Sequence, residues 1–275
     1  MVTPVKSGTA TITATTSNGL KATYTVTVRK VATAPFMISH AMGGIGGTNY
    51  SNCLEAFNEN YAEGHRVFEV DIELTSDGRM VLWHDWKRAF CSRYKAGVQP
   101  SFAQFMGSKI YDRYTPMSIE NLLMIMHDHP DIRVITDSKY AATADVKKQF
   151  KALVKTAAKL GVEEVLDQFI VEIYNQSMYR TIESIHHFND YVFTLYKLFK
   201  KAPSKDQLKT VARFCAENDV FMIAMYAKWW KPSYMDVLDA YDIDAGLYTT
   251  NSASEAQTFF DQGVTALFTD FLPPV

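Results

Sequence analysis

Four polar residues interrupt an otherwise apolar stretch at residues 66–86, RVFEVDIELTSDGRMVLWHDW. Glu69 and Asp71 stand among the apolar residues of a predicted strand, and His84 and Asp85 end the strand that follows the turn. Burying an unpaired charge is costly, so such carboxylates are normally paired, hydrogen-bonded or bound to a metal ion. The pattern therefore predicts a chemical site built on this pair of strands.

The two carboxylates have the spacing of metal ligands. Glu69 and Asp71 are two residues apart on one strand, so their side chains point to the same face. Two close carboxylates repel each other, which raises the pKa of one of them unless a cation lies between them. Oxygen ligands of this kind suit Ca²⁺ or Mg²⁺, and Asp137, which ends a later predicted strand, could supply a third oxygen.

The turn TSDG decides where His84 lies relative to these carboxylates. With Asp77 and Gly78 at the centre of the turn, Asp71 lies opposite His84. With the turn moved back by one residue, Glu69 lies opposite instead. Either register predicts His84 beside the carboxylate pair.

A second histidine completes the candidate site. His40 ends an earlier predicted strand, FMISH, and could face His84 across the carboxylates. Two histidines that flank a hard metal ion are typical of general acid and general base catalysis on a phosphate ester. A lone histidine is more often a hydrogen-bonded structural residue, but its combination with Glu69, Asp71 and His84 favours catalysis.

The elements that must position these residues alternate between strands and helices. Eight apolar runs have the pattern of strands: 36–40, 66–73, 133–137, 168–174, 191–196, 220–226, 245–250 and 266–270. Helix-like segments separate them, which predicts βαβ units and a parallel sheet. Eight such strands are the number in an α/β TIM barrel, (β/α)8. The alternative is a doubly wound open sheet, which the missing glycine-rich nucleotide turn after the first strand disfavours.

The run at 79–85 is a ninth strand. It follows its predecessor too closely for a crossover helix, so we expect it to be antiparallel. In a barrel the chemistry lies at the carboxyl ends of the strands. Polar and aromatic residues lie at or just after several of these ends and are candidate substrate-binding residues: Lys139, Glu172, Tyr174, Tyr196 and Trp229. Each could instead be an ordinary packing or surface residue.

Composition limits the function further. The 275 residues are 47% hydrophobic and carry a net charge of −2, so there is no electrostatic case for nucleic acid or an anionic membrane as partner. No run approaches the roughly 18 apolar residues of a membrane span, and no signal peptide is visible. The three cysteines, Cys53, Cys91 and Cys215, form neither a zinc pattern nor a disulfide framework.

The first residues differ from the rest of the chain. Residues 1–30 alternate threonine or serine with apolar residues around Asn18-Gly19, which is a strong hairpin signal. The pattern GTATITA…NG…TVTV resembles the C-terminal end of a bacterial Ig-like domain of group 2, followed by a linker at 31–35 and the main domain at 36–275. The resemblance implies an exported or cell-surface bacterial protein whose Ig-like domain is only partly present. A free-standing hairpin docked on the main domain is the alternative.

The segments ISHAMGG, SNCLEAF and FEVDIELTSDGRMVLWHDW together resemble the glycerophosphodiester phosphodiesterase family, in the superfamily of bacterial phosphatidylinositol phospholipase C. The family's later Glu-x-Lys is DSK here, and its terminal motif is FTDFLPP. The resemblance implies a TIM barrel whose metal ligands are Glu69, Asp71 and Asp137. It also implies an acid/base pair, His40 and His84, and two residues that contact phosphate or hold the site, Asn52 and Lys139.

Two departures from the family pattern affect the expected chemistry. Ala41 replaces the arginine that follows the first histidine, so a phosphate-binding guanidinium is missing. Asp137 replaces a glutamate and is one methylene shorter. The expected activity is metal-dependent hydrolysis of a small or polymeric phosphodiester, with a phospholipase C-like lyase or an inactive binding module as alternatives. Glycoside hydrolysis is disfavoured, because two carboxylates on one strand do not flank a glycosidic bond.

Overall fold

The computed structural model describes residues 8–28 and 34–275. The chain divides into two compact units, Met1–Ala34 and Pro35–Val275. Most of the predicted linker at 31–35 and the ends of the predicted 1–30 segment lie outside the described residues. The domain assignment of this region therefore stays a prediction.

The first unit contains a β-hairpin of β1 (Gly8–Thr15) and β2 (Lys21–Val28). The strands pair in antiparallel register with Thr15 opposite Lys21. The turn is closed by a hydrogen bond from Thr16 N to Leu20 O of 2.9 Å. Gly19 has φ +86°, a conformation that glycine adopts without steric cost. The hairpin predicted at Asn18-Gly19 is confirmed.

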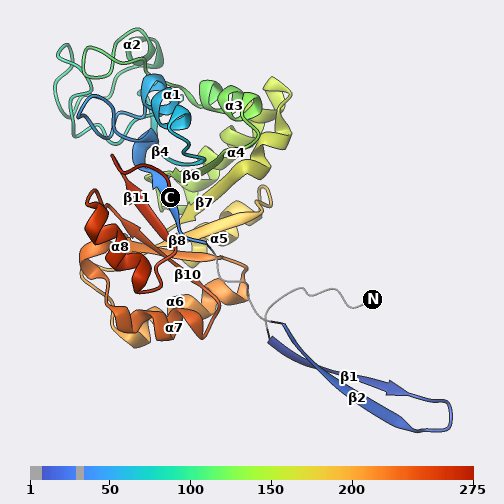
Figure 1. The fold of residues 1–275 in the computed structure, drawn as a ribbon. Coiled ribbons are helices and arrows are strands. Elements are labelled where there is room, and N and C mark those ends of the chain that lie inside the picture. The colour runs from blue at the N-terminus through green and yellow to red at the C-terminus, as the bar shows by residue number, and fades with distance from the viewer. Residues whose placement is uncertain (1–7, 29–33) are drawn as a thin grey trace. The chain divides into compact units, whose positions relative to one another are not determined.

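The second unit is a closed (β/α)8 barrel (Figure 1). Its eight parallel strands are β3 (Phe36–Ser39), β4 (Val67–Leu74), β6 (Arg133–Asp137), β7 (Phe169–Ile173), β8 (Asp190–Thr194), β9 (Met222–Tyr226), β10 (Asp244–Tyr248) and β11 (Ala266–Thr269). The barrel closes because β3 pairs with both β11 and β4. The predicted TIM barrel is confirmed, and the open-sheet alternative is wrong.

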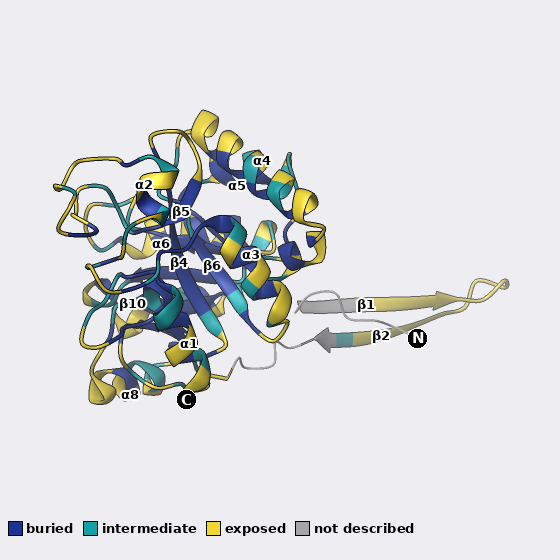
Figure 2. Ribbon diagram, turned by 90° about the horizontal axis from the view of Figure 1, so that it is seen from above, coloured by how far each residue is buried: buried dark blue, intermediate teal, exposed yellow. Residues whose placement is uncertain are grey.

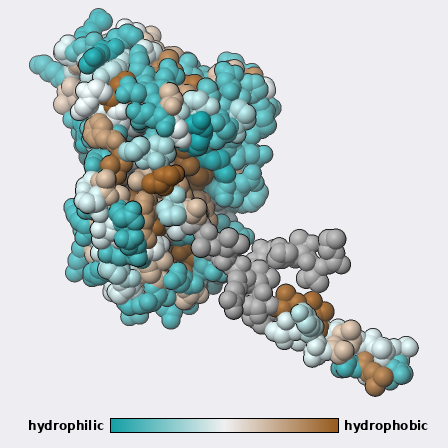
Figure 3. Space-filling model, in the orientation of Figure 1, coloured by the Kyte–Doolittle hydropathy of each residue, from teal (hydrophilic) through white to brown (hydrophobic). Residues whose placement is uncertain are grey.

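Helices surround the barrel and expose their outer faces (Figure 2). The α-helices of the described chain are α1 (Leu54–Ala62), α2 (Phe102–Met106), α3 (Ile119–Asp128), α4 (Thr143–Leu160), α5 (Gln176–Glu183), α6 (Lys205–Glu217), α7 (Met235–Asp239) and α8 (Ala253–Asp261). The 3₁₀ turns are η1 (His40–Met42), η2 (Glu163–Gln168), η3 (Ala227–Trp229) and η4 (Pro232–Tyr234). Hydrophilic side chains cover most of the outer rim of this unit (Figure 3), as a ring of amphipathic helices requires.

The ninth strand, β5 (Met80–Leu82), is antiparallel to β4 as predicted. Both predicted registers are wrong, however. Ile72 pairs with Leu82, a register midway between the two, because the turn has three residues between Thr75 and Arg79. His84 therefore lies beyond the last paired residue and reaches the carboxylates from the chain that leaves the strand.

A cluster of buried apolar side chains, which we call the plug, fills the interior of the barrel. The polar residues lie beyond it, toward the carboxyl ends of the strands. Eight buried side chains form the plug: Ile38, Ile135, Ile170, Val192, Met222, Ala224, Ala266 and Phe268. Because alternate strand residues point inward, the residues two positions further along also face the barrel axis. This alternation places His40, Asp137, Glu172 and Asp270 in the layers above the plug.

Two further observations concern disulfide bonds and membrane-spanning helices. Cys53, Cys91 and Cys215 are all buried and free, so no disulfide links them. Within the described residues, no helix has both the length and the apolar character needed to cross a membrane.

Candidate active site

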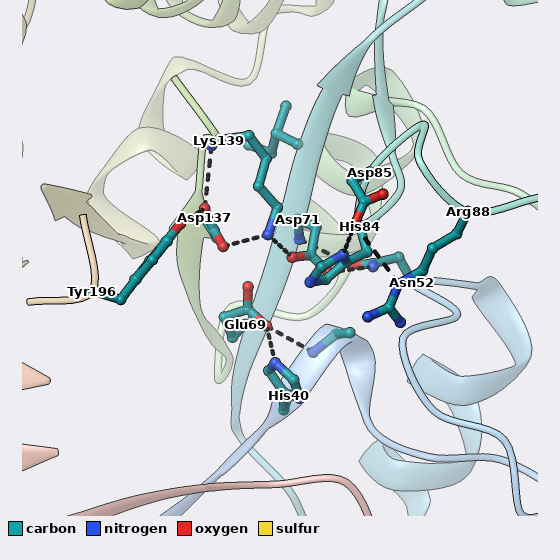
Figure 4. A network of polar contacts seen from close by, with 12 residues as sticks. His40, Asn52, Glu69, Asp71, His84, Asp85, Arg88, Asp137, Lys139 and Tyr196 are labelled. Atoms are coloured by element: carbon teal, nitrogen blue, oxygen red, sulfur yellow. Dashed lines mark hydrogen bonds and ion pairs between the residues drawn. The ribbon is translucent and has the colours of Figure 1, made fainter. Parts of the chain in front are cut away.

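A cavity of about 440 Å³ opens at the carboxyl ends of the barrel strands. Five of the predicted site residues line it: His40, His84, Asp137, Lys139 and Tyr196. Residues without a predicted role line it as well, among them Tyr50, Lys197, Tyr226 and Tyr248. The two strand-borne carboxylates lie beside the histidines, Glu69 next to His40 and Asp71 next to His84 (Figure 4).

Three carboxylates from β4 and β6 converge beneath the histidines. Glu69 and Asp71 are only 3% and 1% exposed. One ligand oxygen from each of Glu69, Asp71 and Asp137 lies within 4.8 Å of the others. Burial and the charge of Asp71 raise the pKa of Glu69 well above its usual range. Carboxylate oxygens are the kind of ligand that a hard divalent cation takes, so the residues present fit a metal ion.

Lys139 is the cation that the structure places in this cluster. Its Nζ contacts Asp71 Oδ1 and lies 2.5 Å from Asp137 Oδ2. Burial alone would lower the pKa of Lys139, but the charges of Asp137 and Asp71 raise it well above its usual range. Burial alone would raise the pKa of Asp71, but the charge of Lys139 outweighs burial and lowers this pKa. The ammonium therefore stays charged and neutralises part of the carboxylate charge.

His40 is oriented by Asp270. Its Nδ1 lies 2.8 Å from Asp270 Oδ1, and its Nε2 lies 3.9 Å from Glu69 Oε2. Burial lowers the pKa of His40, but the hydrogen bond to Asp270 and the charge of Glu69 outweigh it and raise the pKa overall. Asn49 and Asn251 each donate to Asp270 Oδ2, at 3.1 and 2.8 Å, which holds this carboxylate in place.

His84 has the opposite shift. Its Nδ1 lies 2.6 Å from Asp85 Oδ2. Burial lowers its pKa, and the charges of Lys139 and Arg88 add to this effect and outweigh the carboxylates nearby. His40 therefore keeps its proton to a higher pH than His84 does. That is the division of roles that general acid–base catalysis needs.

Tyr50 separates the two histidines. Its ring meets His40 and His84 edge-on, with centroids 4.8 and 4.7 Å away. The Arg88 guanidinium carbon lies 4.6 Å from the Tyr50 ring centroid, and Arg88 Nε lies 3.7 Å from Asp85 Oδ2. Sequence reasoning missed Tyr50 and Arg88, because both come from irregular segments with no motif to mark them.

Asn52 and Ala41 donate hydrogen bonds to the two carboxylates of β4. Asn52 is buried; its Nδ2 donates to Asp71 Oδ2 at 2.7 Å, and its Oδ1 accepts from Asp71 N at 3.0 Å. Ala41 N donates to Glu69 Oε2 at 2.8 Å. Both residues have positive φ, +49° for Asn52 and +50° for Ala41. The structure thus gives Asn52 a contact with a carboxylate and Ala41 a backbone contact.

The remaining predicted residues lie around the cavity at different depths. Tyr196 lines it, and its hydroxyl lies 3.4 Å from Asp137 Oδ1. Tyr174 is 1% exposed and donates its hydroxyl to Asp137. Glu172 is buried below, and burial together with the charge of Asp137 raises its pKa well above its usual range. Trp229 packs edge-on against Tyr226, with ring centroids 4.9 Å apart, behind the cavity wall.

Comparison with known proteins agrees with this geometry. Residues 43–95 match the model of the Glycerophosphoryl diester phosphodiesterase family, which confirms the predicted resemblance over that segment. The match includes Asn52, Glu69, Asp71 and His84. It does not extend to residues 1–34, whose Ig-like assignment stays a prediction. No curated protein is significantly similar to the chain.

Solved structures with the same fold include three phosphodiesterases. A phosphodiesterase from Oleispira antarctica, in complex with the product sn-glycerol-3-phosphate, has a TM-score of 0.67 and 15% identity over 87% of this chain and 94% of its own. A glycerophosphodiester phosphodiesterase from Parabacteroides distasonis has a TM-score of 0.66 and 15% identity over 88% and 95%. One from Thermotoga maritima has a TM-score of 0.58 and 14% identity over 85% and 93%. At these identities the likeness establishes the barrel fold.

Proposed function

We propose that the chain is a metal-dependent phosphodiesterase of the glycerophosphodiester phosphodiesterase family, which hydrolyses a glycerophosphodiester to an alcohol and glycerol 3-phosphate. The observation that carries this proposal is the pair of cavity-lining histidines, each held by a carboxylate at Nδ1, beside three converging carboxylates. The family match at 43–95 supports it. The product in the Oleispira antarctica phosphodiesterase supports glycerol 3-phosphate as the product here.

The proposed cofactor is Ca²⁺ or Mg²⁺, held by Glu69, Asp71 and Asp137. When bound, such an ion would neutralise charge that develops on the phosphoryl oxygens. Lys139 adds a second positive charge at the same place, and Asn52 keeps Asp71 oriented. Ala41 supplies no guanidinium, so Lys139 is the buried cation nearest the expected phosphate position. A lysine acts there as a point charge without the bidentate geometry of arginine.

The histidines divide the proton transfers. Because Nδ1 of each ring faces a carboxylate, the Nε2 atoms are left for the substrate. His84 Nε2 takes the proton of the attacking hydroxyl, either that of water or that of the glycerol next to the phosphate. His40 Nε2 gives its proton to the oxygen of the leaving alcohol as the phosphorus–oxygen bond breaks.

Attack by the neighbouring glycerol hydroxyl would form a cyclic phosphate first. Water then opens the ring, and the two histidines exchange roles: His40 takes the proton of water and His84 returns one to the glycerol oxygen. A phospholipase C-like lyase is the variant in which the reaction stops at the cyclic phosphate. A binding module that has lost turnover is the alternative of another class; Ala41 favours it, whereas the intact histidine pair favours an enzyme.

Release of glycerol 3-phosphate from a panel of glycerophosphodiesters tests the proposal. We expect release in Ca²⁺ or Mg²⁺, loss of release in chelator, and a drop of at least about 10²-fold in His84→Ala, the scale of a general base. His127→Ala is the matched control, because His127 lies on the surface beside Glu164. Cyclic phosphate without glycerol 3-phosphate would identify the lyase, and no product from any diester would contradict an enzyme.

The proposed location is outside the cell or on its surface. The support is the resemblance of residues 1–30 to the end of a bacterial Ig-like domain, a type of module that exported proteins carry. Substrates in that compartment include deacylated lipids and phosphodiester polymers. Immunodetection of the protein in fractionated cells of its source organism tests this assignment, and recovery in the cytosol alone would contradict it.

A further inference from the structure

Three tyrosines form one wall of the catalytic cavity. Tyr196 follows β8, Tyr226 ends β9 and Tyr248 ends β10, and all three line the cavity. Their ring centroids are 4.9 Å apart for Tyr226 and Tyr248 and 6.3 Å apart for Tyr196 and Tyr226. We call these three residues the tyrosine wall. None of them belongs to the acid/base pair or to the carboxylate cluster.

The tyrosine wall lies across the barrel from the metal-ligating strand. Three strands separate β9 from β4 in either direction around the barrel. A phosphate bound over Glu69 and Asp71 therefore has the wall on the opposite side of the cavity. A diester bound there can therefore place one of its two ester arms against this wall.

Two lysines already occupy faces of the tyrosine rings. Lys228 Nζ lies 5.2 Å from the Tyr226 ring centroid. Lys197 Nζ lies 5.4 Å from the Tyr196 ring centroid and donates to the backbone oxygen of Lys139 at 2.6 Å. An aromatic cage attracts a quaternary ammonium through open ring faces. Here an incoming ammonium would find like charges at those faces, which disfavours it.

The wall also offers polar contacts to an uncharged ligand. The Tyr248 hydroxyl is buried and has no hydrogen-bond partner among the described residues. A buried hydroxyl without a partner is costly, and a ligand hydroxyl would satisfy it. Phenol rings offer an apolar face beside a hydroxyl that donates and accepts, which matches the carbon skeleton and hydroxyls of a polyol.

We propose that the tyrosine wall binds the alcohol arm of the diester and selects an uncharged polyol, such as glycerol or inositol, over a choline or ethanolamine group. This inference rests on the proposed phosphodiesterase function. Lys197 and Lys228 are the residues that discriminate against cationic groups, and Tyr248 is the residue that binds a polyol hydroxyl. The selectivity therefore comes from residues at the ends of β8–β10, which are distinct from the acid/base pair.

The test compares kcat/KM for glycerophosphoinositol, glycerophosphoglycerol, glycerophosphocholine and glycerophosphoethanolamine. We expect the two polyol diesters to be preferred by at least tenfold. Lys228→Met keeps most of the side-chain volume and removes the charge, so it should narrow this preference several-fold by raising kcat/KM for glycerophosphocholine. Tyr248→Phe should also narrow the preference for polyol diesters, by lowering kcat/KM for those diesters. Lys209→Met is the matched control on the exposed face of α6 and should leave the preference unchanged.

The outcomes separate this inference from the proposed function. Hydrolysis with equal or greater preference for glycerophosphocholine would overturn the inference and keep the phosphodiesterase. If no diester is hydrolysed, the proposed function fails, and calorimetric titration with inositol 1-phosphate and with phosphocholine still tests the wall. Tighter binding of inositol 1-phosphate, reduced in Tyr248→Phe, would support the inference, and tighter binding of phosphocholine would overturn it.

Discussion

His40 and Asp270 come from the first and last strands of the barrel and meet at 2.8 Å between Nδ1 and Oδ1. The pairing of β3 with β11 creates this contact, because it brings residues 230 positions apart onto adjacent strand ends. The carboxylate fixes which ring nitrogen faces the cavity and helps to raise the pKa of His40. Barrel closure and the orientation of His40 are therefore coupled at this contact.

Asp270→Asn should weaken catalysis, although it changes no side chain that contacts the substrate. The variant loses the negative charge that stabilises protonated His40, so the pKa of His40 falls and the acid is deprotonated at lower pH. We expect kcat/KM to drop by roughly 10²-fold and the alkaline limb of its pH profile to move to lower pH. Asp131→Asn, which alters the surface pair with Arg66, is the control. An unmoved alkaline limb would contradict the role of Asp270.

The wild-type pH profile of kcat/KM should be bell-shaped. His84 must be neutral to accept a proton, and its pKa lies below the usual value of about 6.5, so the acid limb falls below that value. His40 must be protonated, and its pKa is raised, so the alkaline limb lies above about 6.5. A profile that rises steadily through this range would contradict the assignment of acid and base.

Arg88→Ala should move only the acid limb of that profile. The Arg88 charge helps to lower the pKa of His84, so its removal raises this pKa and the acid limb moves to higher pH. Arg93→Ala is the control, because Arg93 is an exposed arginine in the same connecting segment. Equal displacement of both limbs would show that Arg88 acts on the site as a whole and not on His84.

The sequence predicted the barrel because strand and helix patterns repeat along the chain and local hydrophobic spacing determines them. It also predicted the carboxylates and histidines, since polar residues inside apolar strands are conspicuous. The register of β4 and β5 could not be predicted, because a three-residue turn instead of a two-residue turn is a small difference in local energy. Tyr50 and Arg88 were missed because only tertiary packing brings their loops to the site.

The arrangement of the tyrosine wall could not be predicted from the sequence either. Tyr196 was a candidate binding residue because it follows a strand end, but the relation among Tyr196, Tyr226 and Tyr248 depends on the order of strands around the closed barrel. The positions of Lys197 and Lys228 over those rings depend on loop conformations. Sequence patterns therefore located the candidate histidines and carboxylates, whereas the arrangement of the tyrosine wall depends on the folded loops.

Lys139→Met should make the stability of the protein depend more strongly on bound metal. Removing the ammonium leaves Asp71 and Asp137 without their partner, and an uncompensated buried charge costs about 3 kcal/mol or more. We expect a lower unfolding temperature in chelator and a larger rise on adding Ca²⁺ or Mg²⁺ than in wild type, because the cation replaces the lost charge. Lys148→Met on α4 is the surface control. Equal metal-induced shifts in wild type and Lys139→Met would contradict competition between the lysine and a metal ion.

Asn52→Ala should weaken metal binding more than its loss of stability explains. The variant removes both hydrogen bonds that fix Asp71, one to its carboxylate and one from its backbone nitrogen. Loss of such an orienting partner typically lowers metal affinity 10–100-fold. Asn60→Ala is a matched control, because Asn60 is also buried but bonds to the backbone oxygens of Gly44 and Ala56. Both variants should unfold at lower temperature, since each leaves buried polar groups without partners. Calorimetric titration with Ca²⁺ and Mg²⁺ should separate them: metal affinity should fall in Asn52→Ala and stay near wild type in Asn60→Ala. Equal affinities in the two variants would mean that Asp71 keeps its orientation without Asn52.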